Sequence, residues 1–459
     1  MSLSSIRPSS PAITHLATLH ADEQRAPRYT SYPTALAFTA NFPASQLRRA
    51  LRASNDDPVP PALSLYLHLP YCAAACFYCG CHRWISRSPQ RHRELLGLLQ
   101  QEITLLGALT ASDRPVRQIH FGGGTPNLWP PADLRALLDA LHAAFPQWEE
   151  PEISIEIDPR QARPGDAAAW AAMGINRVSV GVQDLDLRVQ QAINRVQPAE
   201  QVATVLADLR AAGLRQINLD LILGLPWQTA ASLHHSLDWV IAQQPGRIAL
   251  FAYAHMPARF PAQRAIPEHA LPDAAARIAL QADARKQLCR AGYVDIGLDH
   301  YARPDDPLAV AQGAGRLRRN FQGYTVLDNA DLLGIGPSAI SDVGPCLSQN
   351  HGARDEYAAC LARGELPTHR GYWRTAEDLR TGAVIEELMC LRRIDTAAWT
   401  AQYGEPFESH FDRACARLQQ IDPTQQLLRR QGAIWTATPA GRRVLRSLAR
   451  CFDTHTPAH

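Results

Sequence analysis

Four cysteines lie within ten residues of one another, directly after the first strongly apolar segment of the chain. The apolar run covers residues 63–69, and Cys72, Cys76 and Cys79 follow it with the spacing C-x-x-x-C-x-x-C, with Cys81 two residues later. The intervening residues are too irregular for a helix or a strand. Iron–sulfur clusters are held by Cys thiolates, and three close thiolates supply one ligand fewer than a cubane cluster needs. The spacing therefore predicts a cluster-binding loop with one iron open to another ligand.

Two other uses of these cysteines are weighed against a cluster. A structural zinc site pairs two Cys elements that are well separated in sequence, and no second Cys or Cys/His pair appears downstream. A redox pair at Cys76 and Cys79 leaves Cys72 and Cys81 unexplained. Ten cysteines in 459 residues are too sparse for a disulfide framework. An iron–sulfur cluster is the favoured interpretation.

Segments rich in Val, Ile, Leu and aromatic residues alternate with amphipathic helical patterns from residue 63 onward. The predicted strands are 63–69, 118–121, 152–157, 177–182, 216–223 and 247–253. Near-continuous apolar strands joined by helices indicate a parallel sheet covered by helices. The predicted fold class is α/β, a partial (β/α)6 TIM-like barrel of parallel strands with an N-terminal arm and a smaller, mainly α C-terminal domain.

Polar residues and glycines gather at the C-terminal ends of the predicted strands, where such barrels place their active sites. The glycines 122–124 at the end of the second strand lack Cβ atoms, so a ligand could approach the backbone there, although a tight turn is the other explanation. Glu156, Gln183 and Asp220 are single polar residues at the ends of otherwise apolar strands. Each alone could be structural, but together they resemble a ligand shell facing one barrel mouth.

The strand and helix alternation stops near residue 299, and residues 376–448 are mostly helical in pattern, with a short hairpin around 434–438. We predict an N-terminal arm and extension over 1–60, a barrel over 61–300 and a mainly helical domain over 301–459. Residues 1–20 have the composition of a disordered segment.

The formal net charge is +2 at pH 7, so no overall field favours nucleic acid or a membrane surface as a partner. The N-terminus lacks an apolar region followed by a small-residue cleavage site, and no apolar run approaches the ~20 residues that span a bilayer. We therefore expect a cytoplasmic protein.

The cysteine motif after the first strand, followed by GGGTP after the second, resembles the radical S-adenosylmethionine enzymes. The match is closer still to the oxygen-independent coproporphyrinogen III oxidases. It covers residues 27–452 and includes PRYTSYPTA, CFYCGC, GGGTP, SIEIDPR, GVQD, NLDLILGLP, YAHMP, DHYARPDD, RNFQGYT and LGIGPSAIS. The cysteine motif identifies only the superfamily, whereas PRYTSYPT, Cys81 and RNFQGYT make the assignment specific. His82, Tyr78 and Pro337 are mild departures from the family pattern.

The resemblance implies a [4Fe–4S] cluster on Cys72, Cys76 and Cys79, whose open iron takes the amino and carboxylate groups of S-adenosylmethionine. It also implies two S-adenosylmethionine molecules in one site. The cofactor-binding residues carried over by matching position are Tyr66, Tyr78, Gly123, Gly124, Thr125, Glu156, Gln183, Arg195, Asp220, Ala254, Phe321, Gln322 and Ile340. Cys81 and Arg28 are expected near the substrate, and no catalytic residue is assigned.

The reaction implied is the conversion of two propionate side chains of coproporphyrinogen III to vinyl groups by a 5′-deoxyadenosyl radical, giving protoporphyrinogen IX. The expected partners are the tetrapyrrole substrate, an electron donor and an electron acceptor, and the chain is expected to be a monomer. The alternative is a haem-binding or haem-delivering relative without oxidase activity. That alternative predicts loss of PRYTSYPT and of the cysteine at position 81, and both are present.

Overall fold

The computed structural model describes residue 23 and residues 26–456 of the chain. The disordered segment expected for residues 1–20 therefore lies outside the described residues. The described chain forms two compact units, which are treated separately below. The larger comprises residues 38–313 and 326–374, and the smaller comprises the described residues up to 37 together with 314–325 and 375–456.

Six parallel strands form the centre of the larger unit and belong to a 13-stranded sheet. They are β2 (Ala62–Leu69), β5 (Val116–Gly123), β6 (Trp148–Ile157), β7 (Arg177–Gln183), β8 (Gln216–Leu223) and β9 (Arg247–Ala252). Each pairs in parallel with the next in chain order. The terminal strands of the sheet order, β1 and β10, do not pair with each other in the described chain, so the barrel is partial, as predicted.

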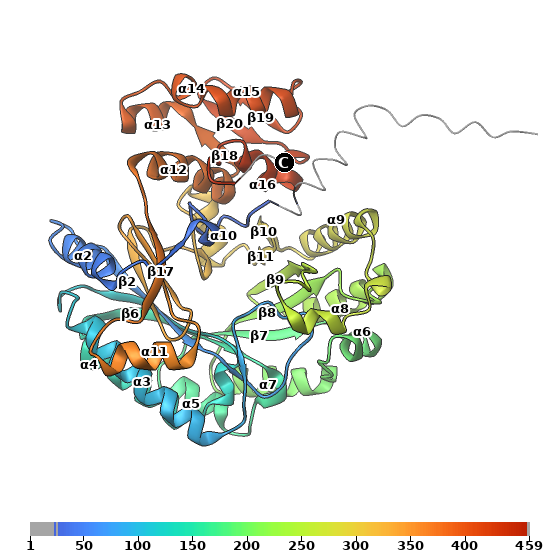
Figure 1. Cartoon of the computed structure of the whole chain (residues 1–459). Coiled ribbons are helices and arrows are strands. Elements are labelled where there is room, and N and C mark those ends of the chain that lie inside the picture. The colour runs from blue at the N-terminus through green and yellow to red at the C-terminus, as the bar shows by residue number, and fades with distance from the viewer. Residues whose placement is uncertain (1–22, 24–25, 457–459) are drawn as a thin grey trace, which may run out of the picture. The chain divides into compact units, whose positions relative to one another are not determined.

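Helices cover the outer side of these strands, and α3, α4, α5, α7 and α8 are visible there in Figure 1. The helices of this region are α3 (Pro89–Gly107), α4 (Pro131–Ala144), α5 (Asp166–Ala172), α6 (Leu187–Ala192), α7 (Ala199–Ala211), α8 (Ala230–Ala242) and α9 (Ala274–Arg290). Helix α4 buries a stripe of leucines that includes Leu134, Leu137, Leu138 and Leu141. This burial of one apolar face is the main reason that an amphipathic segment becomes a stable helix in a protein.

Strands that the sequence does not indicate extend both edges of the sheet. They are β14 (Ala330–Ile335), β15 (Ile340–Val343), β16 (Cys346–Asn350), β17 (Thr368–Trp373) and β1 (Thr39–Ala40) at one edge, and β11 (His300–Ala302) and β10 (Val294–Gly297) at the other. Strand β14 is parallel to β2, and the strands beyond it are antiparallel to their neighbours. Helices α2 (Ala44–Asn55), α10 (Pro307–Gly313) and α11 (Arg354–Ala362) complete the unit. Residues 326–374 therefore group with the barrel, whereas the boundaries at 60 and 300 stay a prediction.

The smaller unit is mainly helical around an aromatic core. Its helices are α12 (Ala376–Leu391), α13 (Thr396–Tyr403), α14 (Phe407–His410), α15 (Asp412–Ile421) and α16 (Leu445–Arg450). Its strands are β12 (Arg318–Asn320), β13 (Gly323–Thr325), β18 (Arg393–Asp395), β19 (Leu428–Gln431) and β20 (Ile434–Ala437). Trp399 and Phe407 stack edge to face with a centroid separation of 5.5 Å. The described part of the N-terminal arm up to residue 37 belongs here, and the Tyr29 hydroxyl donates to the Asp453 carboxylate at 3.0 Å.

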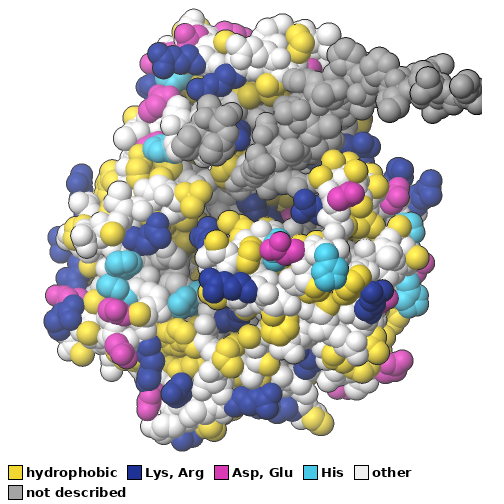
Figure 2. Space-filling view, turned by 45° about the vertical axis from the view of Figure 1, so that its right-hand side comes forward, with side chains coloured by type: hydrophobic (Ala, Val, Ile, Leu, Met, Phe, Trp, Pro, Cys, Tyr) yellow, Lys and Arg dark blue, Asp and Glu magenta, His cyan; other side chains and the backbone are white. Residues whose placement is uncertain are grey.

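Charged side chains are spread over the surface. On the face drawn in Figure 2, basic, acidic and histidine side chains of described residues are interspersed with apolar and neutral ones. This agrees with the near-neutral net charge of +2. Within the described residues, the helices are too short or too polar for any of them to cross a bilayer.

Candidate cluster and cofactor site

A short pair of parallel strands closes the base of the cysteine loop at the C-terminal end of β2. Strand β3 (Tyr71–Cys72) pairs with β4 (Trp84–Ile85). The Trp84 N–H donates to the Pro70 carbonyl at 2.8 Å, and the Ser86 N–H donates to the Cys72 carbonyl at 3.0 Å. All four cysteines thus lie in one closed loop at the barrel mouth, as the sequence predicts for a strand end.

Two of the predicted ligand sulfurs accept a hydrogen bond from a neighbouring loop residue. The Thr125 hydroxyl donates to Cys72 Sγ at 3.3 Å, and the Cys81 N–H donates to Cys79 Sγ at 3.4 Å. Hydrogen bonding by Cys81, helped by the charge of Arg83, lowers the pKa of the Cys79 thiol to about 6. Burial raises the pKa of Cys72 to about 11. Of these two thiols, that of Cys79 is the more readily deprotonated.

Two arginines donate to the third sulfur. Arg160 Nη2 lies 3.5 Å from Cys76 Sγ, and Arg195 Nη1 lies 3.6 Å from it. Both guanidinium groups also bind Asp158 Oδ2, at 2.7 Å from Arg160 and 3.2 Å from Arg195. Burial alone would raise the pKa of Asp158, but the two arginines outweigh it and hold that pKa below its usual range. The sulfur of Cys76 thus faces a fixed, cationic group of side chains.

The backbone of the cysteine loop is held by Arg83. Its Nη1 donates to the carbonyls of Cys79 at 3.0 Å and Cys81 at 3.3 Å, and its Nη2 donates to that of Cys76 at 3.4 Å. One guanidinium group therefore satisfies three carbonyls of a segment that has no regular structure to pair them.

The glycines after β5 allow their loop to pack closely against the end of β2. A Cβ atom on Gly124 would lie 2.6 Å from the Pro70 carbonyl, and one on Gly123 would lie 2.6 Å from the His68 ring. Gly123 also has φ of +111°, a conformation that strongly favours glycine. These glycines therefore allow the two loops to pack closely. This role is additional to the one expected from the sequence, in which a ligand approaches their backbone.

Glu156 is held at the barrel mouth by two donors. Its carboxylate accepts from the Gly123 N–H at 3.2 Å and contacts His120 Nε2 at 3.2 Å. Burial would raise its pKa, but the bonds to His120 and Gly123 outweigh this and lower it. The His120 ring stacks on Tyr66 with a centroid separation of 5.7 Å. Three predicted contacts, Tyr66, Gly123 and Glu156, are therefore gathered around His120.

Asp220 lies on β8 and accepts from Ser179 Oγ at 2.6 Å and from Asn218 Nδ2 at 2.7 Å. Burial and the nearby charge of Glu156 raise its pKa to about 6. Gln183 ends β7 with φ of +67°, beside Gly181. These residues line the same end of the sheet as Glu156.

The remaining predicted contacts divide between the two units. In the larger unit, Gln263 Nε2 donates to the carbonyls of both Tyr78 and Ala254, at 3.0 and 3.1 Å, which ties these two positions together. Ile340 begins β15, which lies between β14 and β16 in the sheet. Arg28 and the turn residues Phe321 and Gln322 belong to the smaller unit, and their part in the site stays a prediction.

Sequence reasoning overlooked His120, Arg83 and Arg160. His120 had a signal, because it precedes the glycines near the end of an apolar strand. Arg160 also had one, because it is the last residue of the matched segment SIEIDPR, whereas Arg83 had none.

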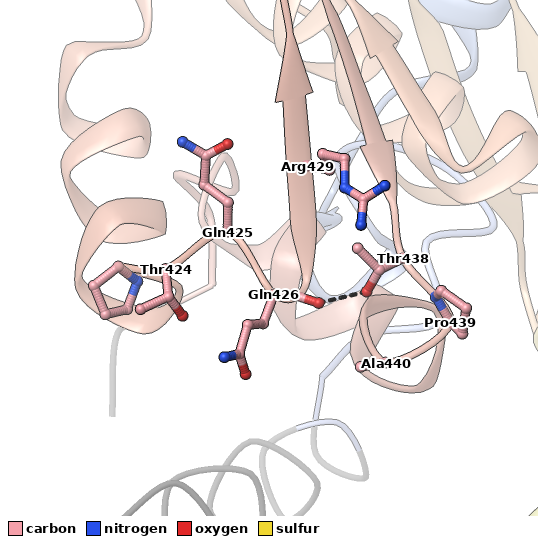
Figure 3. A pocket seen from close by; sticks show the side chains of 8 residues that line it. Thr424, Gln425, Gln426, Arg429, Thr438, Pro439 and Ala440 are labelled. Carbon is pink, nitrogen blue, oxygen red and sulfur yellow. Dashed lines mark hydrogen bonds between the residues drawn. The ribbon is translucent and has the colours of Figure 1, made fainter.

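A shallow hollow of about 730 Å³ in the smaller unit is a different feature (Figure 3). It is lined by Pro423, Thr424, Gln425, Gln426, Arg429, Thr438, Pro439 and Ala440. Arg429 is the only charged side chain of this lining, and no predicted site residue belongs to it. The barrel mouth remains the candidate site.

The three cysteines have the chemistry that a cluster needs. Their thiols are free, and each sulfur accepts at least one hydrogen bond, which suits an anionic cluster. Among the described residues, no three Cys, His, Asp or Glu side chains converge on one ion. A cubane cluster does not require such convergence, because its thiolates bind separate irons. The donor set therefore fits a cluster better than a single metal ion.

Comparisons with known proteins agree with this geometry. The Radical SAM superfamily model matches residues 66–240, and the HemN C-terminal domain model matches residues 375–444. The oxygen-independent coproporphyrinogen III oxidase of Pseudomonas aeruginosa is 39% identical over 434 residues, which cover 94% of each chain. That of Escherichia coli is 38% identical over 429 residues, covering 94% of this chain and 93% of the relative.

A solved structure is similar over nearly the whole chain. It is that of coproporphyrinogen III oxidase (HemN) from Escherichia coli, described as a radical SAM enzyme, with a TM-score of 0.89 and 37% identity. It covers 94% of this chain and 98% of the other. The partial barrel with its cysteine loop is thus that of a radical S-adenosylmethionine protein. Within that class, the chain belongs to the family of oxygen-independent coproporphyrinogen III oxidases.

Proposed function

We propose that this chain converts coproporphyrinogen III to protoporphyrinogen IX without oxygen, by oxidative decarboxylation of two propionate side chains to vinyl groups. The observation that carries the proposal is the match to the curated oxidases over 94% of both chains at 39% identity. A match of this extent includes the C-terminal region as well as the barrel that the whole superfamily shares. The haem-binding alternative is not favoured, because the relatives carry the oxidase name.

The cofactors of this chemistry are a [4Fe–4S] cluster and two molecules of S-adenosylmethionine. When bound, they supply a carbon radical that removes a hydrogen atom from the substrate side chain. Cys72, Cys76 and Cys79 would hold the cluster. The predicted contacts at positions 66, 78, 123–125, 156, 183, 195, 220, 254, 321, 322 and 340 would hold S-adenosylmethionine.

The residues of the barrel mouth have distinct tasks in this proposal. Glu156 stays ionised because its pKa is lowered, so it offers a fixed carboxylate to the cationic groups of S-adenosylmethionine. Gly123 and His120 orient that carboxylate. Asp220, whose pKa is about 6, presents a second carboxyl group nearby.

The assay for vinyl product tests the proposal. After anaerobic reconstitution, the chain is expected to hold about four irons and to form vinyl product only with S-adenosylmethionine and a reductant. No decarboxylation under these conditions would reject it. Formation of 5′-deoxyadenosine that coproporphyrinogen III fails to stimulate would indicate another substrate, and stable haem binding without turnover would restore the alternative.

Cysteine substitutions test which sulfurs hold the cluster. Cys76→Ser is expected to lose the cluster, because the variant removes one of the three thiolates that would hold it. Cys81→Ser is expected to keep the cluster with lowered activity, because Cys81 is not one of the three predicted ligands and the variant retains the backbone N–H that donates to Cys79 Sγ. Iron and sulfide analysis of the two purified variants makes the comparison. Equal iron loss in both would show that this division is wrong.

Several finer points belong to the same proposal. Cys81 and Arg28 act near the tetrapyrrole, and the chain works in the cytoplasm as a monomer with a separate electron donor and acceptor. Neither nucleic acid nor a membrane is a partner. The near-neutral charge of +2 supports this last point.

A further inference from the structure

The three cluster sulfurs have unequal surroundings. Cys72 Sγ accepts from a neutral hydroxyl and Cys79 Sγ from a backbone N–H, whereas Cys76 Sγ faces two guanidinium groups. Arg195 is one of the positions that the family resemblance assigns to S-adenosylmethionine. Arg160 is not among those positions, and the proposed function leaves it without a task.

Arg160 is fixed more firmly than an ordinary surface arginine. Its Nε and Nη2 form a fork on the Asp158 carboxylate, at 3.0 Å to Oδ1 and 2.7 Å to Oδ2. Its own backbone N–H also donates to Asp158 Oδ1 at 3.0 Å. The side chain is 18% exposed, so solvent screens its charge only in part.

Asp158 is fixed in turn by Asn127. The Asp158 N–H donates to Asn127 Oδ1 at 2.9 Å, and Asn127 Nδ2 donates to the Asp158 carbonyl at 3.0 Å. Asn127 is completely buried. The Arg160 guanidinium is therefore held toward Cys76 by a rigid support from β6 and the loop after β5, and little side-chain entropy opposes its contact with the sulfur.

We infer that Arg160 tunes the iron–sulfur cluster of the proposed function by donating to the Cys76 sulfur, which makes the cluster easier to reduce. Reduction adds one negative charge to the cluster and its thiolates. A cationic donor on a ligand sulfur stabilises the more negative state, and hydrogen bonds to sulfur are among the factors that set cluster potentials. Two guanidinium groups and one carboxylate leave this group of side chains with one net positive charge beside the sulfur. Arg160 is thus a positioning residue that acts through Cys76.

The test is a reductive titration of the reconstituted holoenzyme, followed by electron paramagnetic resonance without S-adenosylmethionine or substrate. In Arg160→Met, the ratio of reduced to oxidised cluster at a fixed potential is expected to fall about tenfold, which for one electron is a shift of about 59 mV. Arg160→Lys keeps the charge but loses the fork, so a smaller shift in the same direction is expected.

Arg163→Met is the matched control. This arginine is three residues further along the chain and exposed, and its guanidinium donates to the Leu128 carbonyl at 2.9 Å. Its substitution is expected to leave the titration unchanged.

The inference would be overturned if Arg160→Met retained its iron and titrated at the same potential as wild type. An equal shift of potential in Arg163→Met would overturn it as well. Loss of iron from both Arg160→Met and Arg160→Lys would also overturn the inference, because it would show that Arg160 has only a structural role. Failure of the proposed function would be seen separately, as a missing cluster or missing vinyl product in the unmodified chain.

Discussion

Replacing Asp331 with Ala is expected to lower the free energy of unfolding by about 3–5 kcal/mol, the typical cost of removing one partner of a buried ion pair. Asp331 pairs with Arg114 at 2.6 Å, and the two side chains are 5% and 0% exposed. Arg114 also donates to the Pro61 carbonyl at 2.8 Å and to Asn55 Oδ1 at 3.3 Å. The variant would leave a buried guanidinium without its counter-charge, beneath the edge where β14 joins the barrel.

The ion pair between Arg117 and Glu149 provides the matched control. Its N–O distance of 2.5 Å is nearly the same, but the side chains are 49% and 53% exposed. Solvent-exposed pairs contribute about 0–1 kcal/mol, so Glu149→Ala should change stability by no more than that. Urea unfolding of both variants, followed anaerobically, measures the difference. Equal changes in the free energy of unfolding would contradict the view that burial, rather than distance, determines how much an ion pair contributes to stability.

The central barrel could be predicted from sequence because each of its strands carries several buried apolar residues, such as Leu63, Leu65, Leu67 and Leu69 in β2. Strand β8 was predicted with its observed bounds, and β7 was predicted to within one residue. Strands β14 to β17 were not predicted for a different reason. They are short, and the region contains glycines and charged residues such as Asp331 and Asp342, whose burial depends on arginines elsewhere in the chain.

The site could be predicted in part for a similar reason. Cysteines, glycines and carboxylates at strand ends are conspicuous against apolar strands, so Cys72, Glu156 and Asp220 were recognisable. The side chains that hold them are common residue types placed by tertiary structure alone. Arg83 reaches the cysteine loop through backbone contacts that no local pattern encodes, and the contact of Arg160 with Cys76 joins residues 84 positions apart.

A buried carboxylate that accepts from three neutral donors links several parts of the larger unit. Glu102 on α3 accepts from the Gly336 N–H at 2.7 Å, from Asn350 Nδ2 at 2.7 Å and from the Tyr357 hydroxyl. Glu102 is only 1% exposed. Burial raises its pKa to about 7 from the ordinary value of 4.5, although these three donors oppose the shift. Glu102 therefore joins α3 to α11 and to the turn after β14, and it does so at an electrostatic cost when ionised.

The raised pKa makes stability depend on pH in a defined direction. Between pH 4.5 and about 7 the folded chain retains a proton on Glu102 that the unfolded chain has released, so Glu102 makes the fold less stable as pH rises through this window. The slope reaches about 1.4 kcal/mol per pH unit, so wild type is expected to lose about 2 kcal/mol relative to Glu102→Gln between pH 5.5 and 7. Gln cannot ionise, and it keeps one oxygen as an acceptor.

The comparison of wild type with Glu102→Gln isolates this contribution. Asp184 and Asp220, whose pKa values burial also raises to about 6, titrate equally in both chains and cancel in the difference. Urea unfolding of both holoenzymes at a series of pH values gives the two stability curves. Curves that stay parallel from pH 5.5 to 7 would show that Glu102 does not titrate there. We expect the free energy of unfolding of Glu102→Gln to rise relative to that of wild type as pH rises, so that the two curves converge or cross. The reason is that only wild type must bury a new charge to stay folded.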